Sequence, residues 1–390
     1  MLVRCLAMMR GGGETRHLAW AQELSAMGVE VEIITGGPLL LGAPRHDVTE
    51  LSGIDVTMLR SPYARDFVYR FQHQRGFGRL TMTALHVDEE WFCRLAWRRI
   101  AARPAHSRPD VVHAHALHQA ARLRVGPGGN IPVVINLPGA PHPRYTADLR
   151  EADALVADGW AAEHLPAVLG RPIDRVPKGV DSERFRPSGA NHREALELAD
   201  KRVILTVARL VPIKNVALLV DALAILRQRV PRVHLLIVGE GPDAEALKRR
   251  AAALGVSGAV TFAGYVPQAE TPAFYRSGDV FGLSSDFDNS PNVVLEAMAS
   301  GLPVVTTDVG GVREFVADRI GGAVVPAGDA AALAAGLERY LTLPAAAREA
   351  GAYNRARATS EFSWRASAQR LMDVYHRVIA SRSGTARASA

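Results

Sequence analysis

The sequence contains very little cysteine, since Cys5 and Cys93 are the only two in 390 residues. Two cysteines build neither a disulfide framework nor a metal-ligand pattern, so we interpret both as free thiols and expect a reducing, cytoplasmic compartment. Long hydrophobic runs are also missing. No stretch reaches the roughly 18 apolar residues of a membrane span, and the apolar run at the N-terminus is too short for a secretory signal.

A large excess of charge of one sign is missing as well, because 46 basic residues stand against 40 acidic ones. The small positive excess favours anionic small ligands such as phosphates and predicts no nucleic-acid partner. Hydrophobic residues make up 48% of the chain and charged residues 22%, which excludes global disorder. The length exceeds what one hydrophobic core usually supports, so we expect two domains.

Short β-branched runs alternate with helical patterns along the whole chain. This alternation is typical of parallel sheets covered by helices, and it predicts an α/β fold with two Rossmann-like domains. The expected strands are 2–9, 29–35, 110–116 and 132–137 in the first half, and 202–208, 233–239, 259–266, 279–285 and 302–308 in the second.

The segment 170–201 is rich in proline, glycine and charge and contains little strand pattern, so we place the domain boundary within it, near Phe185. The expected divisions are an N-terminal domain 1–184, a C-terminal domain 185–361, a C-terminal helix 362–380 and a disordered tail 381–390. Two facing domains of this kind bind ligands in a cleft lined by loops at the carboxyl ends of the strands.

Aromatic and basic residues alternate in 63–80, and 88–103 has the pattern of a basic amphipathic helix with Trp91, Phe92 and Trp97. One interpretation is an acceptor-recognition or membrane-surface region. The favoured alternative is a surface loop followed by a helix docked on the core, because apolar stripes at helical spacing usually belong to a core.

The stretch 284–311 carries the clearest helix signal. Ser290 suits an N-cap, Pro291 the first helical position and Gly301 the C-terminal end, so the sequence predicts a helix over 291–300. Its first backbone amides, those of Asn292 and Val293, would point at the ligand side and receive a phosphate.

Two carboxylates accompany this helix. Glu296 lies four residues after Asn292, on the same face, and is suited to accept two ribose hydroxyls; Asp288 precedes the helix and could accept hydroxyls of a second sugar. The alternative is that Glu296 is a solvated helical residue and Asp288 an ordinary turn former. Two cations, Arg209 at the end of a strand and Lys214 at the mouth of the next helix, have a spacing that suits a diphosphate.

Together these motifs resemble a known family. The stretches VARLVPIKN (207–215) and SDFDNSPNVVLEAMASGLPVV (285–305), with VGEGP (238–242) and FAGYVP (262–267) between them, are similar to the C-terminal half of the retaining GT-B glycosyltransferases of family 4. The resemblance implies a GT-B architecture, a nucleotide diphosphate sugar donor, and transfer with retention, without a metal or any other cofactor.

The resemblance also implies residue roles. Arg209 and Lys214 would bind the diphosphate and Glu296 the ribose, while the backbone of Gly264, Tyr265 and Val266 would contact the base. The loop Asp288, Asn289, Ser290, Pro291, Asn292 and Val293 would hold the donor sugar and phosphate. The family carries two glutamates separated by seven residues, and this pattern is present here as Asp288 and Glu296. Arg209, Lys214 and Asp288 are the expected catalytic residues.

The N-terminal half gives weaker signals. Gly11 to Gly13 begin a glycine-rich turn, but Arg16 replaces the third glycine of a dinucleotide fingerprint. We therefore expect Gly12 and Gly13 to close over the sugar-phosphate end of the donor and Arg16 or His17 to face the acceptor, with a plain tight turn as the alternative.

Histidines provide the remaining candidates. His113 and His115 point to the same side of their expected strand, and with no third ligand nearby we assign them to the site or the core rather than to a metal. The family's donor-contacting histidine is replaced by Pro138. His142 and Asn136 are the candidates to take its place, with a surface-loop histidine as the alternative for His142.

The sequence thus predicts a retaining glycosyltransferase that moves a hexosyl or aminohexosyl group from a UDP- or GDP-sugar to a small sugar, cyclitol, aminocyclitol or natural-product acceptor. The diphosphate leaving group would serve as the base. The alternatives are a sugar-nucleotide epimerase and a non-catalytic nucleotide- or carbohydrate-binding module. The lack of a strong membrane motif favours a soluble acceptor over membrane association, and both monomer and dimer remain open.

Overall fold

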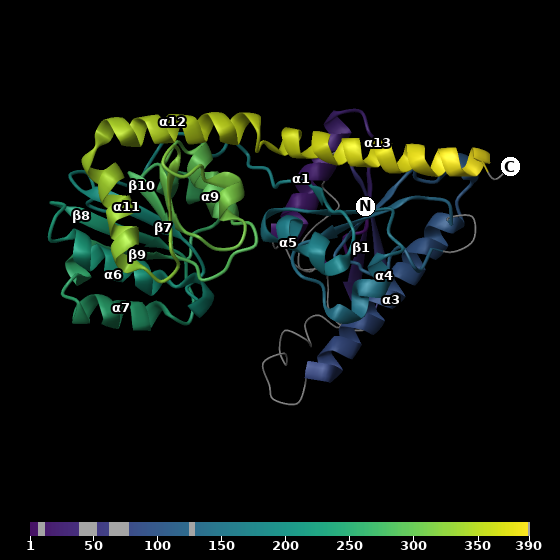
Figure 1. Cartoon of the computed structure of the whole chain (residues 1–390), viewed down its shortest axis with the longest axis horizontal. Coiled ribbons are helices and arrows are strands. Elements are labelled where there is room, and N and C mark those ends of the chain that lie inside the picture. Colours follow the sequence, from purple (N-terminus) through teal and green to yellow (C-terminus); the bar gives the residue numbers. More distant parts are fainter. Residues whose placement is uncertain (7–11, 39–52, 62–77, 125–128, 389–390) are drawn as a thin grey trace. The chain divides into compact units, whose positions relative to one another are not determined.

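The computed structural model describes residues 1–6, 12–38, 53–61, 78–124 and 129–388, with side chains left undescribed at 12, 38, 61, 78–82 and 383–388. The chain divides into two compact units (Figure 1). Unit 1 comprises Met1–Pro177 and Ser367–Ala390, and unit 2 comprises Lys178–Ala366. The stretches 7–11 and 62–77, which include Gly11 and most of the aromatic and basic segment, lie outside the described residues.

Unit 1 contains parallel strands in the order β3-β4-β5-β6 and a parallel pair, β1 and β2. Leu2 links the two groups through isolated bridges to Ile34 and Ala114. The expected strand 2–9 is therefore not formed over its described part, residues 2–6, beyond this single bridge position. The strands are β1 (Glu32–Pro38), β2 (Asp55–Ser61), β3 (Val112–His115), β4 (Val133–Leu137), β5 (Ala154–Ala157) and β6 (Asp174–Arg175).

The helices of unit 1 are α1 (Gly12–Ala26), α3 (Gly78–Ala101), α4 (Thr146–Leu149) and α5 (Gly159–Leu169), with short 3-10 turns at Ala105–Ser107 and Pro143–Tyr145. The helix α3 docks on the core, as the favoured interpretation of its sequence predicted. Phe92 and Trp97 are fully buried, and the Trp97 indole N–H donates to the Ala120 carbonyl at 2.7 Å, whereas Trp91 is exposed. Both cysteines are buried thiols.

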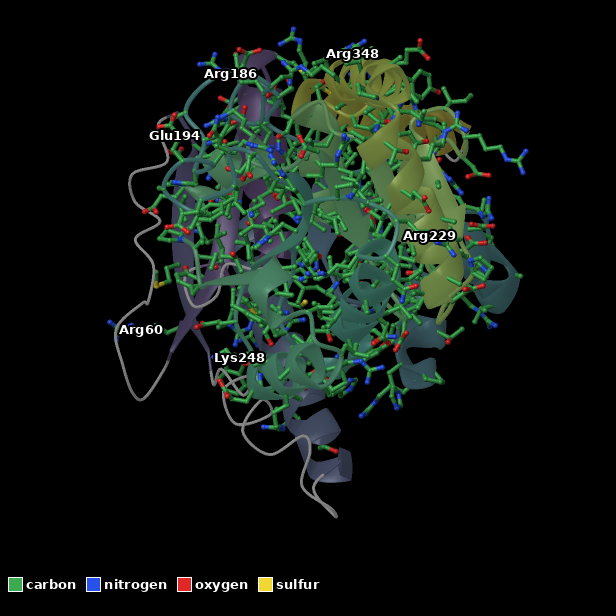
Figure 2. The ribbon with its side chains drawn as sticks, turned by 90° about the vertical axis from the view of Figure 1, so that its left-hand side faces the viewer. Arg60, Arg186, Glu194, Arg229, Lys248 and Arg348 are labelled. Atoms are coloured by element: carbon green, nitrogen blue, oxygen red, sulfur yellow. The ribbon has the colours of Figure 1, made fainter. Side chains whose placement is uncertain are left out.

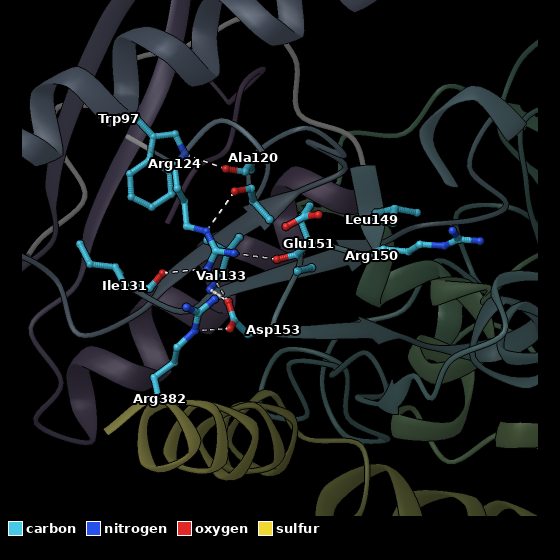
Figure 3. Close-up of polar contacts among 12 residues, drawn as sticks. Trp97, Ala120, Arg124, Ile131, Val133, Leu149, Arg150, Glu151, Asp153 and Arg382 are labelled. Atoms are coloured by element: carbon cyan, nitrogen blue, oxygen red, sulfur yellow. Dashed lines mark hydrogen bonds and ion pairs between the residues drawn. The ribbon is translucent and has the colours of Figure 1, made fainter. Parts of the chain in front are cut away.

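An ionic network ties the C-terminal helix α13 (Trp364–Ala388) to the sheet of unit 1 (Figure 3). Asp153 accepts from the Val133 N–H at 2.7 Å, from Arg124 at 2.8 Å and from Arg382 at 2.6 Å. The expectation of a disordered tail from residue 381 is therefore wrong as far as Ala388, because α13 continues to that residue. Adding residues to an existing helix costs little, and the Arg382 contact holds the added turn in place.

Unit 2 is a six-stranded parallel sheet in the order β12-β11-β10-β7-β8-β9. Its strands are β7 (Arg202–Val207), β8 (Val233–Val238), β9 (Val260–Gly264), β10 (Val280–Leu283), β11 (Val304–Thr307) and β12 (Gly322–Val325). The first three strands run outward from β7 in one direction and the last three from β10 in the other. The point between β7 and β10 is therefore the topological switch point, where open α/β sheets bind ligands.

Alternate residues of these strands face two separate apolar clusters. Ile204 and Leu235 pack under α6, α7 and α11, while Leu205 and Leu236 pack against α8, α9 and α10. The helices are α6 (Val216–Leu226), α7 (Ala244–Ala253), α8 (Thr271–Tyr275), α9 (Asn292–Ala299), α10 (Val312–Phe315), α11 (Ala330–Thr342) and α12 (Pro344–Ser360), with 3-10 turns at Pro212–Lys214 and Ser257–Ala259. The long charged side chains labelled in Figure 2, such as Arg229 and Lys248, point outward from the ribbon.

The boundary between the units falls seven residues earlier than the expected 184/185. Val180 already pairs with Ser363, its N–H donating to the Phe362 carbonyl at 2.8 Å, and Phe185 is buried in the core of unit 2. Composition indicated the connecting segment, but hydrogen bonds to a strand-like partner almost two hundred residues away decide where it joins.

Candidate functional site

The loops that follow β7 and β10 are bonded to each other at the switch point of unit 2. The Asp286 N–H donates to the Ile213 carbonyl at 2.9 Å, and the Asn215 amide donates to the Asp286 carboxylate at 2.9 Å. The Ser284 hydroxyl donates to the Lys214 carbonyl at 3.2 Å. We call residues 208–215 and 284–291 the switch-point loops. Two of the expected catalytic residues, Lys214 and Asp288, lie on opposite loops.

The Lys214 ammonium forms a salt bridge with the Asp288 carboxylate. Both side chains are partly buried, with 18% and 15% of their surfaces exposed. The backbone of Asp288 is also fixed, because its carbonyl accepts a hydrogen bond from the Gly311 N–H at 3.2 Å. Gly310 has a φ of 56°, and a Cβ there would lie 1.6 Å from the Asp288 oxygen, so only glycine fits.

Arg209 is exposed two residues beyond the end of β7. Its loop rests on the loop after β8, where a Cβ on Gly239 would lie 1.9 Å from the Ala208 carbonyl oxygen. The Gly239 N–H also donates to the Gly264 carbonyl at 2.8 Å, so the end of β9 joins the same edge of the sheet. Tyr265, next to it, is 68% exposed.

Helix α9 begins one residue later than predicted. Pro291, with extended backbone, takes the N-cap position, and the Ser290 hydroxyl is buried with no hydrogen-bond partner among the described residues. Sequence reasoning missed Lys178, whose ammonium donates to the Ser290 carbonyl at 2.7 Å. The helix ends at Ala299, one residue before the predicted end, and Gly301 follows with the expected left-handed backbone: its φ is 76°, and its N–H donates to the Met298 carbonyl at 3.0 Å.

Glu296 is half-buried on α9, and the Tyr275 hydroxyl donates to its Oε2 at 2.6 Å. The alternative of a solvated helical residue is therefore wrong. Burial raises the pKa of Glu296, and the hydrogen bond from Tyr275 opposes that rise. Burial and the neighbouring carboxylate hold the pKa of Tyr275 well above its usual value, so it remains a donor. Tyr275 gave no signal in the sequence.

In unit 1 the structure contradicts two acceptor-side expectations. Arg16 is buried and forms a salt bridge of 2.6 Å with Asp158, which is also fully buried. His17 is fully buried, with its ring centroid 4.4 Å from that of His115 and 5.0 Å from that of His113. Both residues lie on the face of α1 that packs against the strands, so neither faces an acceptor.

His115 and Asn136 are cross-strand neighbours, and His115 Nδ1 lies 3.1 Å from Asn136 Oδ1. Gly13 allows the His115 ring to approach α1, because a Cβ on Gly13 would lie 2.2 Å from His115 Nε2. This close packing gives Gly13 a structural task, and the expected contacts of Gly12 and Gly13 with a donor remain predictions. No group of three metal-ligating side chains occurs in the described ranges.

A pocket of about 390 Å³ opens within unit 1, at the carboxyl ends of β3 and β4. Of the expected acceptor-side residues, His115 and the exposed His142 line it, as does Pro138, whereas Asn136 is buried outside the lining. Sequence reasoning missed its other polar lining residues, which are Arg4, Asp88, Glu89, His118 and Tyr145. They come from four separate chain segments, which no local pattern connects.

Comparison with known proteins identifies the C-terminal half. Residues 189–357 match the family model described as glycosyl transferases group 1. The matched residues, which all lie in unit 2, are similar to that family. The glycosyl transferases group 1 region contains both switch-point loops, Glu296 and Tyr275, so the candidate donor site lies inside the matched residues.

Curated relatives of this group 1 region carry names of sugar-transferring enzymes. The chain is 37% identical over 212 residues to the GDP-mannose-dependent alpha-(1-6)-phosphatidylinositol monomannoside mannosyltransferase of Mycolicibacterium smegmatis, covering 52% of this chain and 56% of that protein. It is 35% identical over 256 residues to the D-inositol 3-phosphate glycosyltransferase of Salinispora tropica, covering 59% and 52%. The matches thus span about half the length of these relatives.

Solved structures show the fold over nearly the whole chain. Anabaena HepE in complex with UDP has a TM-score of 0.71 at 20% identity, covering 96% of this chain and 98% of that one. The sucrose-phosphate synthase from Thermosynechococcus elongatus has a TM-score of 0.72 at 20% identity, covering 97% and 98%. The expected fold class, α/β with the two Rossmann-like domains of GT-B proteins, is confirmed. No described helix has the length and apolar character to span a bilayer.

Proposed function

We propose that this chain is a retaining glycosyltransferase that moves a hexosyl or aminohexosyl group from a nucleotide diphosphate sugar to a hydroxyl of a small sugar, cyclitol, aminocyclitol or natural-product acceptor. The observation that carries the proposal is the switch point of the group 1 region. There Arg209, Lys214 and the first turn of α9 lie on two loops that hydrogen bonds fix to each other.

The diphosphate is where negative charge grows as the glycosyl bond breaks. Cations and backbone amides fixed before the reaction stabilise that charge without reorganising. Asp288 holds the Lys214 ammonium at the switch point, and Arg209 is exposed on the same loop. The amides of Asn292 and Val293 open helix α9 and add its positive dipole end. We propose that these groups bind the diphosphate without a metal.

Glu296 is suited to hold the ribose of the donor. Its Oε2 is fixed by Tyr275, so the carboxylate has one orientation before a ligand binds. A carboxylate accepts two sugar hydroxyls more strongly than a neutral group does. The neighbouring edge at Gly264 to Val266 is proposed to contact the base.

The acceptor hydroxyl is proposed to lose its proton to the departing diphosphate, on the face that the leaving group vacates. No protein base is then needed. The pocket of unit 1, with His115 and His142 in its lining, is the proposed acceptor site. The names of the two curated relatives include inositol-based acceptors, which supports the polyol class.

Radiolabelled UDP- and GDP-sugars, incubated with purified protein and a panel of sugar and cyclitol acceptors in the presence of EDTA, test this function. We expect nucleoside diphosphate release that depends on the acceptor and survives chelation. Epimerised donor without an acceptor requirement would identify an epimerase instead, and binding without turnover a binding module. Loss of turnover on chelation would overturn the metal-independent mechanism alone.

Arg209→Ala gives the residue-level test, with Arg229→Ala as its matched control. Both arginines are exposed in unit 2, but Arg229 precedes β8 at the amino edge of the sheet and pairs with Glu338. We expect turnover to fall by on the order of 10² in Arg209→Ala and to stay normal in Arg229→Ala. Equal rates in the two variants would remove Arg209 from the site.

A further inference from the structure

Glu89 is the carboxylate of the unit 1 pocket that has no arginine or lysine bound to it in the described ranges. It lies on α3 with 11% of its side chain exposed, and it accepts the Gln119 backbone N–H at 3.1 Å. An ionisable nitrogen near it is His118 Nδ1, 3.6 Å from its Oε1. Tyr145 also donates to Glu89. Neutral donors therefore hold the carboxylate in place at the pocket wall.

Arg4, the lining arginine, is already committed to other groups. Its Nη2 donates to Asp88 at 2.5 Å, and its guanidinium lies 5.3 Å over the Phe92 ring. The backbone of Gly36 covers it from the other side, since a Cβ on Gly36 would lie 2.0 Å from Arg4 Nη1. Because it is enclosed in this way, the guanidinium cannot form a bidentate pair of hydrogen bonds with a phosphate.

The charges of the pocket therefore do not balance. Among its lining residues the structure gives one arginine, no lysine and two carboxylates, Asp88 and Glu89, together with three histidines. Arg4 and Asp88 cancel each other, so with neutral histidines the remaining formal charge is that of Glu89. A partly buried negative charge repels an anion more strongly than an exposed one, because water screens it less.

We propose that this pocket takes a polyhydroxylated acceptor without a phosphate group, either neutral or amine-bearing, and that Glu89 determines this preference. The Glu89 carboxylate accepts hydrogen bonds from hydroxyl or ammonium groups of the acceptor and rejects phosphate esters. The inference rests on the proposed function in one respect, namely that the bound molecule is called an acceptor. The binding itself involves unit 1 alone. This inference separates this chain from the Salinispora relative, whose name includes an inositol phosphate.

Two stacked rings form part of the pocket wall beside Glu89. Tyr145 stacks on His118, with centroids 4.4 Å apart and planes 16° apart, so both rings are fixed in orientation. Burial and the nearby Glu89 charge keep the pKa of Tyr145 above its usual value, and it therefore donates rather than ionises. A flat ring beside a carboxylate suits the apolar face and the hydroxyl edge of a sugar or cyclitol.

Isothermal titration of the full chain with three probes tests the proposal. The probes are myo-inositol, an inosamine in which an amino group replaces one hydroxyl, and inositol 3-phosphate, so that the ring stays constant while its charge changes. We expect the inosamine to bind at least as tightly as inositol, and the phosphate at least roughly tenfold more weakly, the scale of one charge interaction in a partly buried site.

Variants assign the effect to one residue. Glu89→Gln keeps an oxygen that can accept from the Gln119 N–H. It should reduce the difference in affinity between inositol and inositol 3-phosphate roughly tenfold, whereas Glu89→Asp should leave that difference unchanged. The matched control is Glu90→Gln, the next residue on α3, which pairs with Arg94 and does not line the pocket. It should leave all three affinities unchanged.

Tighter binding of the phosphate, equal binding of all three probes, or no binding of any would overturn the proposal. So would an unchanged preference in Glu89→Gln when its circular dichroism and melting temperature match the wild type. The measurement needs no donor and no turnover. A chain that selects among the probes but binds neither UDP nor GDP would therefore refute the proposed function and leave the pocket assignment standing.

Discussion

Lys214 and Asp288, which lie 74 positions apart in the chain, form a salt bridge across the switch point of unit 2. The family resemblance assigned each of them separately to the donor. In the structure each one positions the other, so the ammonium is oriented before an anion arrives. A pair of this kind links the position of a cation to the integrity of the opposite loop.

Asp288→Asn should therefore lower turnover by at least tenfold while the fold is retained, because Lys214 loses the charge that orients it. The control is Asp286→Asn, on the same loop, where the exposed carboxylate bonds only the Asn215 amide among the partners described. Steady-state rates with a labelled donor measure both. Equal losses in the two variants would indicate a general effect on the loop instead.

Glu296→Gln should weaken nucleoside diphosphate binding by roughly tenfold, the scale of one hydrogen bond to a charged group. The loss should vanish for a nucleotide whose ribose lacks both free hydroxyls, because the carboxylate then has nothing to accept. Tyr275→Phe should give a smaller loss, since it frees the carboxylate without removing it. Calorimetric titration of the wild type and both variants with both nucleotides gives these affinities; an equal effect of Glu296→Gln on both nucleotides would argue against the ribose assignment.

Gly13→Ala should destabilise unit 1 by about 1–3 kcal/mol, the usual cost of overpacking. Its Cβ would lie 2.2 Å from His115 Nε2, so the ring or the helix must shift. At Gly139, also in unit 1, an added Cβ meets nothing within 4 Å, and Gly139→Ala should be nearly neutral. Urea unfolding curves of the two variants measure the difference, and similar midpoints would contradict the close approach.

Acid should destabilise the protein through His17 and His113. Burial, and to a lesser extent neighbouring positive charge, hold both pKa values well below 6.5 in the folded chain. The unfolded chain takes up protons below about pH 6.5 that the folded chain does not. The contribution of these residues is therefore complete above pH 6.5 and is lost as the pH falls, by up to about 1.4 kcal/mol per pH unit for each histidine.

Melting temperatures between pH 7.5 and about 5 check this slope. His113→Asn should be less stable at neutral pH, because it loses the contact of Nδ1 with the Tyr375 hydroxyl, but its stability should fall less on acidification. His106→Asn, at an exposed position, should follow the wild-type curve. A parallel slope in His113→Asn would rule that residue out as a source.

The sequence was sufficient for elements with strong local patterns. The strands β7 to β11 carry apolar, partly β-branched runs, and a glycine follows α9, so the bounds of these elements were predicted to within two residues. The short strands β5 and β12, ALVA and GAVV, contain mostly small residues and gave no strand signal. Their assignment depends on neighbours in the sheet rather than on their own composition.

Side-chain roles were harder to predict, because they depend on distant partners. Arg16 has the charge of a ligand-binding residue, but it pairs with Asp158, 142 positions away. Glu89 and Tyr145 share a pocket that local periodicity does not reveal. Arg209 and Glu296 were assigned from motifs, and the structure places both at or beside the carboxyl edge of the sheet while leaving their ligands to the experiments above.

The division of unit 1 between the two ends of the chain also affects the order in which the protein folds during synthesis. The Trp20 indole bonds Ser367, His113 contacts Tyr375, and Asp153 binds Arg382. Unit 2 is one continuous segment, whereas unit 1 lacks these partners until residues 367–382 have been synthesised. We expect the half that is translated first to be the half that matures last.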